Sequence, residues 1–143
     1  MVRKLSGGCL CDAVRFACVP VADEMRICHC TMCRRWTGSV FMGVEVNDCD
    51  IADESALGVY ASSEYGERVF CKTCGSSLFW RMRDGSHVVV AAQAFDDPGR
   101  FELKAEIFID EKPDNYAFAG QAVKLTGAQA LAAFAAEGEL NNG

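Results

Sequence analysis

The sequence lacks the features that would assign it to a membrane, an export route or a nucleic acid. No apolar run in its 143 residues approaches the ~20 residues that a membrane-spanning helix needs. The basic residues near the N-terminus are not followed by the apolar stretch of a secretory signal. We therefore expect a cytoplasmic protein without a membrane partner. The net charge is −6 and no basic run is present, which argues against a nucleic-acid partner because phosphate attraction carries most of that affinity.

The rest of the composition is typical of one globular domain. Half of the residues are hydrophobic and 24% are charged, a balance that argues against disorder. The length suits a single domain, which we expect to span residues 1–143. Short alternating or apolar segments separated by turns predict strands, and only Ala128–Ala136 is rich in helix formers. The predicted fold class is mainly β with a short C-terminal helix, and the oligomeric state is left open.

One local pattern predicts a hairpin. Ser77–Met82 has the alternating pattern of a strand, Asp84 and Gly85 suit a tight turn, and His87–Ala92 is the expected second strand.

The predicted C-terminal helix carries its own boundary signals. Thr126 followed by Gln129 is a capping box, and Gly138 suits the C-terminal cap. Leu131 and Phe134 share one face, which we expect to dock on the domain.

Cysteine is the residue in excess. A count of nine allows a disulfide framework, but such frameworks belong to short secreted chains. This chain is not short, shows no export signal and has an odd count, so its clustered cysteines are interpreted as metal ligands or redox groups. Cys18 and Cys49 belong to no cluster, and we expect both to pack as small hydrophobic residues.

Two outer cysteine pairs predict a closed metal site. They are Cys9, Cys11, Cys71 and Cys74. Four thiolates around one zinc ion leave no open position, so such a site is structural. Spacing alone does not decide which pair joins which.

A central triplet predicts a second, open site. Its three thiols lie within six consecutive positions: Cys28, Cys30 and Cys33. Three protein ligands plus water or substrate form the pattern of a catalytic zinc ion. The triplet is therefore the candidate catalytic group.

Three residues that flank these thiols are candidate substrate-binding groups. His29 can be a fourth ligand that closes the site, a loop histidine bonded to backbone, or a proton carrier near the metal. Arg34 and Arg35 can lower the thiol pKa values and pair a substrate carboxylate. The alternative for either arginine is a solvated position on a loop.

These motifs together resemble the glutathione-dependent formaldehyde-activating enzyme family, also called CENP-V/GFA. The matching segments run from Gly7 through Lys112-Pro113 and include 7–11, 28–38, 70–78, 95–98 and 107–108. The resemblance implies an Mss4-like fold of coiled antiparallel sheets. It also implies a structural zinc ion on the four outer cysteines and a catalytic zinc ion on the triplet, the division inferred above from spacing.

The resemblance implies an activity as well. The family's reaction is that of a carbon–sulfur lyase, which joins formaldehyde to the thiol of glutathione and yields S-hydroxymethylglutathione. The expected partner is therefore a small thiol such as glutathione. The sequence departs from the family pattern where Asp12 replaces a glycine, Glu106 a histidine and Asn115 a tryptophan. Asp12 is expected to affect only a turn, whereas Glu106 and Asn115 stand where the family carries pocket groups.

Two other functions compete with the enzyme. One is a non-enzymatic zinc module that binds a partner protein, with both metal sites structural. The other is a redox protein of the methionine sulfoxide reductase type, which we rank last because no cysteine follows Cys74.

Overall fold

The computed structural model describes residues 3–142, with side chains described up to residue 136. The chain divides into two compact units, one formed by residues up to 25 and by 42–102, the other by 26–41 and the residues from 103 onward. Each unit is described by itself, and the single domain expected over residues 1–143 stays a prediction. None of the described helices is both long and apolar enough to span a membrane.

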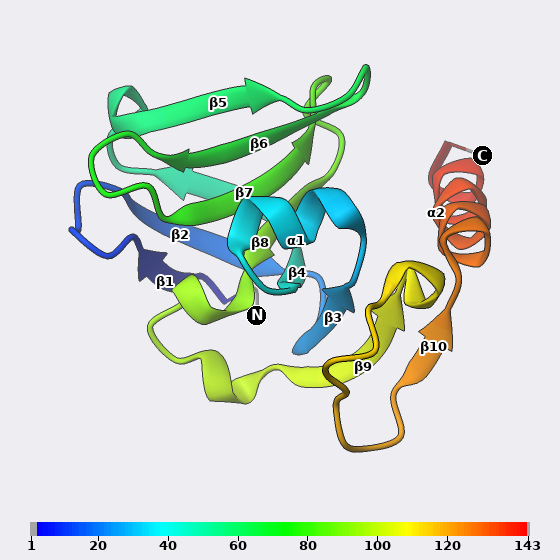
Figure 1. Cartoon of the computed structure of the whole chain (residues 1–143). Coiled ribbons are helices and arrows are strands. Elements are labelled where there is room, and N and C mark those ends of the chain that lie inside the picture. Colours follow the sequence, from blue (N-terminus) through cyan, green and yellow to red (C-terminus); the bar gives the residue numbers. More distant parts are fainter. Residues whose placement is uncertain (1–2, 143) are drawn as a thin grey trace. The chain divides into compact units, whose positions relative to one another are not determined.

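The first unit is built on antiparallel strands. In spatial order these are β1 (Leu5–Gly8), β2 (Arg15–Pro20), β4 (Phe41–Ile51), β8 (Val88–Ala91), β7 (Ser77–Met82), β6 (Gly66–Cys71) and β5 (Leu57–Ala61). Every neighbouring pair is antiparallel, and Figure 1 shows β5, β6 and β7 side by side. The described residues of this unit also form three 3-10 turns: η1 (Glu54–Ala56), η2 (Ala92–Ala94) and η3 (Pro98–Arg100).

The predicted hairpin is confirmed as the β7–β8 pair. The backbone N–H of Met82 donates to the carbonyl of His87 over 2.9 Å and closes the loop. Within the loop, the Asp84 carboxylate accepts the N–H of Ser86 over 2.8 Å. Short-range turn chemistry therefore fixes this register.

The core of the first unit follows the alternation seen in the sequence. Val14, Phe16 and Cys18 are all buried, as a half-buried strand requires. The Phe16 ring meets Phe79 and Phe95 edge-on, with ring centroids 5.3 Å and 5.4 Å away. This aromatic cluster ties β2 and β7 to the loop that follows β8.

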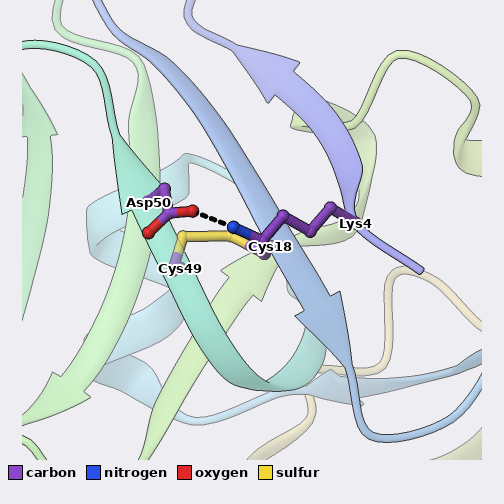
Figure 2. Close-up of a disulfide and its surroundings, with 4 residues drawn as sticks. All are labelled: Lys4, Cys18, Cys49 and Asp50. Atoms are coloured by element: carbon purple, nitrogen blue, oxygen red, sulfur yellow. Dashed lines mark hydrogen bonds and ion pairs between the residues drawn. A yellow bond between two sulfur atoms is a disulfide. The ribbon is translucent and has the colours of Figure 1, made fainter. Parts of the chain in front are cut away.

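Cys18 and Cys49 form a disulfide, so the expectation that both are plain core residues is wrong. The two cysteines are partners in the register of β2 and β4 (Figure 2). The neighbouring Asp50 carboxylate pairs with the ammonium of Lys4. Residues this far apart, with a sequence separation of 31, meet only through strand register, which the sequence pattern does not reveal.

The second unit combines a few strands with two helices. Its elements are β3 (Glu24–Cys28, which enters from the first unit), α1 (Thr31–Thr37), β9 (Glu102–Ile107), η4 (Ile109–Glu111), β10 (Val123–Leu125) and α2 (Gly127–Asn142). Strand β9 lies between β3 and β10, and β9 and β10 run parallel. The mainly β fold class with a C-terminal helix is confirmed, with this parallel pair as an addition to the expected antiparallel pattern.

The C-terminal helix begins as predicted but continues further. The backbone N–H of Gln129 donates to the Thr126 hydroxyl over 3.2 Å, and the N–H of Thr126 donates to the Gln129 side chain over 2.8 Å. Helix α2 runs through Gly138, so the predicted cap there is wrong; a glycine inside a helix costs only about 1 kcal/mol. Leu131 is 61% exposed, which contradicts its predicted docking, whereas Phe134 is only 37% exposed.

Candidate metal sites

The outer cysteine pairs meet in the first unit. Their four sulfurs, from Cys9, Cys11, Cys71 and Cys74, all lie within 4.8 Å of one another. The Cys11 sulfur is 3.7 Å from that of Cys9 and 3.7 Å from that of Cys71. Four sulfurs bound at about 2.3 Å to one tetrahedral zinc ion lie about 3.8 Å apart. The donor set therefore fits a metal ion, and the structure joins the two pairs that spacing left undecided.

The first pair follows strand β1 in a tight loop. The N–H of Cys9 donates to the Val14 carbonyl over 3.0 Å, and the N–H of Val14 donates back to the Cys9 sulfur over 3.2 Å. Asp12 has a φ of 66°, the left-handed conformation that glycine takes freely and aspartate tolerates. Asp12 thus keeps the turn that a glycine would make.

The second pair forms a knuckle after strand β6. The N–H groups of Thr73 and Cys74 point at the Cys71 sulfur over 3.3 Å and 3.4 Å. The Cys74 N–H is the main cause that lowers the pKa of Cys71. Gly75 has a φ of 78° and returns its N–H to the Cys71 carbonyl over 2.9 Å. Glycine is favoured there because a side chain is strained at that φ.

Ser76 connects the two pairs, a role that sequence reasoning did not assign. Its hydroxyl oxygen lies 3.1 Å from the Cys74 sulfur and accepts the N–H of Leu10 over 3.1 Å. The Ser76 hydroxyl is the main cause that lowers the pKa of Cys74 to about 5. The backbone N–H of Ala13 lowers the pKa of Cys11, but burial and the neighbouring thiols outweigh it and raise that pKa to about 12.

The central triplet converges in the second unit. Cys28 ends β3, Cys30 is the N-cap of α1, and Cys33 lies in the helix's first turn. Their sulfurs lie within 4.8 Å of one another, and the Cys30 sulfur accepts the N–H of Cys33 over 3.3 Å. Residues three apart share a helix face, so this arrangement follows from the local fold. Helix α1 runs from Thr31 to Thr37 and has Gly38 as its C-cap.

The chemistry of this triplet also fits a cation. The pKa of Cys28 is raised, first by its hydrogen bonds with Cys30 and Cys33 and then by burial. Three thiols this close together are therefore hard to deprotonate at the same time. A divalent cation bound between them would stabilise the thiolates and so favour deprotonation. Among the residues that the structure describes, no fourth histidine, cysteine or carboxylate atom joins the group.

His29 lies between two of these cysteines but is engaged elsewhere. It is fully buried. Its Nε2 lies 2.8 Å from Oε1 of Glu106, and its Nδ1 lies 2.8 Å from the hydroxyl of Tyr116. Both ring nitrogens are occupied, so His29 is not a fourth ligand in this structure. Glu106 stood out in the sequence only as a departure from the family pattern, and Tyr116 carried no signal.

The two arginines after the triplet differ sharply. Arg34 donates from Nε to the carbonyl of His29 over 2.9 Å, and from Nη2 to the Thr31 hydroxyl over 3.2 Å and the Glu111 carbonyl over 3.4 Å. Arg35 is exposed. Arg34 is thus part of the local fold, whereas Arg35 presents its guanidinium to solvent.

Comparison with known proteins places this fold and these cysteines in a family. The family model described as glutathione-dependent formaldehyde-activating enzyme matches residues 4–111. The chain therefore belongs to the glutathione-dependent formaldehyde-activating enzyme family. The resemblance inferred from the cysteine motifs is confirmed.

Individual relatives agree with this assignment. A Schizosaccharomyces pombe protein named as an uncharacterized lyase is 33% identical over 125 residues, which cover 86% of this chain and 91% of that protein. A Halomonas elongata protein named as a putative glutathione-dependent formaldehyde-activating enzyme is 31% identical over 125 residues, covering 77% of this chain and 78% of that protein.

A solved structure supports the fold alone. The crystal structure of a Rhodobacter sphaeroides protein matches with a TM-score of 0.56 and 22% identity, and the match covers 70% of this chain and all of that chain.

Proposed function

We propose that this protein is a zinc-dependent carbon–sulfur lyase-type enzyme that acts on a small thiol adduct. The prototype reaction joins formaldehyde to glutathione and gives S-hydroxymethylglutathione. The observation that carries the proposal is the convergence of Cys28, Cys30 and Cys33 without a fourth protein ligand among the described residues. Family membership and the names of the two relatives support it.

The proposal assigns different roles to the two cysteine groups. The four outer cysteines hold a structural zinc ion, since four sulfurs complete a tetrahedron. The central triplet holds the catalytic zinc ion. When bound there, zinc supplies the charge that keeps an incoming thiol as thiolate and polarises an aldehyde oxygen.

The chain's own residues bind and orient the substrate. Arg35 is exposed and follows the ligands Cys30 and Cys33 closely in sequence, so it is our candidate to pair a carboxylate of glutathione. Arg34 instead holds the His29 carbonyl. In the reaction the thiol loses its proton, its sulfur bonds to the formaldehyde carbon, and the carbonyl oxygen gains a proton to become the hydroxyl.

One observation favours the non-enzymatic alternative. Cys28 and Cys33 are buried, and only Cys30 of the triplet is partly exposed. Buried sulfurs give a substrate little access to a bound metal ion, and a structural site is closed to substrate. In that alternative both zinc ions are structural and the protein binds a partner protein.

A direct assay separates the two functions. Zinc-loaded protein is mixed with glutathione and formaldehyde, and the S-hydroxymethyl signal is followed by NMR against the spontaneous reaction. We expect faster exchange between the free and bound aldehyde, and loss of that effect in Cys30→Ser. No acceleration with glutathione or with other small thiols, from protein that holds two zinc ions, contradicts the enzyme and favours the module.

A further inference from the structure

His29, which lies between strand β3 and helix α1, is fixed at four points. Its backbone N–H donates to the Ile107 carbonyl over 3.1 Å, and its carbonyl accepts from Nε of Arg34 over 2.9 Å. Its ring nitrogens bond to Glu106 and Tyr116, each over 2.8 Å. All of the polar groups of His29 are therefore used within the second unit.

Because His29 and Glu106 are buried, their hydrogen bonds determine the orientation of the His29 ring. His29 is 0% exposed and Glu106 only 2% exposed, so each needs its partner because unpaired buried polar groups are costly. A carboxylate accepts only, so Nε2–H of His29 donates to Glu106 Oε1, while Nδ1 pairs with the hydroxyl of Tyr116. The second Glu106 oxygen lies 3.7 Å from the ammonium of Lys124. One ring orientation satisfies every partner.

His29 is the residue between the ligands Cys28 and Cys30. Successive Cα atoms are held about 3.8 Å apart by the trans peptide, so any movement of His29 shifts both neighbouring cysteines. A fixed His29 therefore limits the relative positions of the two cysteine backbones before any metal arrives. Ordering that precedes binding removes an entropic cost from the binding step.

We propose that His29 and Glu106 are positioning residues that pre-organise the central cysteine triplet for its metal ion. The inference rests on the part of the proposed function in which the triplet binds zinc, and it does not depend on the substrate. Neither residue is a ligand: Glu106 acts through the His29 ring, and His29 acts through the backbone of Cys28 and Cys30. Partners of this kind typically change metal affinity about 10–100-fold when removed.

The test compares zinc affinity at the two sites in matched variants. Glu106→Leu removes the acceptor, Glu106→Gln keeps an acceptor oxygen, and Lys124→Gln removes only the half-exposed outer partner. Competition with a chromophoric chelator gives both dissociation constants, and a Cys33→Ser chain identifies which one belongs to the triplet. Cobalt(II) spectra of the same chains report the geometry of the sulfur ligands.

We expect Glu106→Leu to weaken the triplet's zinc binding about 10–100-fold and to alter its cobalt spectrum, with the outer site unchanged. The triplet of Glu106→Gln should bind zinc within about threefold of the wild-type affinity. Lys124→Gln should also change that affinity by less than about threefold, because exposed ion pairs contribute little. If Glu106→Leu does not fold, Tyr116→Phe decides: we expect a fall of about 3–10-fold from one lost hydrogen bond.

Three results overturn the inference. If the Glu106→Leu variant folds and its triplet binds zinc as tightly as wild type, this inference is wrong, but the proposed function is not affected. If Glu106→Leu does not fold, the same conclusion follows from unchanged triplet affinity in Tyr116→Phe. An equal loss at both sites also overturns the inference, because that indicates general destabilisation. A wild-type chain that binds a single metal ion overturns the proposed catalytic site, and this inference with it.

Discussion

The outer and central cysteine groups use the same side chain but differ in how the chain assembles them. The outer group joins segments such as Cys11 and Cys71, 60 residues apart, and completes a set of four sulfurs. The central group comes from one strand end and one helical turn and supplies three. A metal ion on the outer group therefore closes a long loop, whereas one on the central group closes almost none. Under the proposed function, the outer ion stabilises the fold and the central ion is available for chemistry.

The largest expected effect tests this division through two matched substitutions. Cys74→Ser removes an outer ligand, and structural zinc supplies about 10–16 kcal/mol of apparent affinity that acts as folding free energy. Since a domain is stable by only about 5–15 kcal/mol, we expect Cys74→Ser to be unfolded at room temperature by circular dichroism. Cys30→Ser should remain folded, with a Tm within a few degrees of wild type and no activity. Similar unfolding of both variants contradicts the division.

A smaller effect is expected from the disulfide of the first unit. Cys18→Ala combined with Cys49→Ala opens a loop with a sequence separation of 31. The chain-entropy relation gives a loss of about 3–4 kcal/mol in the free energy of unfolding. Urea unfolding measures this loss, and wild-type protein in reducing agent is the control. Each metal site should still bind its metal ion in this variant. Loss of the outer metal ion would show that the disulfide and the outer site do not stabilise the fold independently.

Substitution of Arg34 or Arg35 should have the smallest effect on stability, and it tests the different roles assigned to these two residues beside the central group. Arg35→Ala should raise KM for glutathione about 10–100-fold, because a charged hydrogen bond contributes about 1.5–3 kcal/mol, with stability changed by less than about 0.5 kcal/mol. Arg34→Ala should instead lower stability by about 1–3 kcal/mol, because it removes the donor to the His29 carbonyl. Steady-state kinetics and thermal unfolding measure both. An unchanged KM in Arg35→Ala would exclude its role in substrate binding.

Local features were predictable from the sequence because neighbouring residues make them. The β7–β8 hairpin and the capping box of Thr126 and Gln129 each depend on residues only a few positions apart. The cysteine motifs carried the family assignment for the same reason, since their spacings are short and ordered.

Features that join distant segments were not predictable in this way. The Cys18–Cys49 disulfide depends on strand register. His29 lies 77 residues from Glu106 and 87 from Tyr116, and no periodic pattern connects them. The pairing of the outer cysteines was also undecided by spacing, and only the fold brings their four sulfurs together. The sequence therefore indicated the candidate metal ligands more clearly than what holds those residues in place.

The most direct test of the two-site account is X-ray absorption at the zinc edge, before and after glutathione is added to protein with two zinc ions. Four sulfurs at one site and three at the other predict an average of about 3.5 sulfur ligands per zinc, rising to about 4 when the thiol fills the open position. Cys30→Ser protein, which lacks one central ligand, is the control. Two results would contradict the open central site. One is an average of four sulfurs per zinc that does not change when glutathione is added. The other is zinc whose ligands all come from the protein, both before and after glutathione is added.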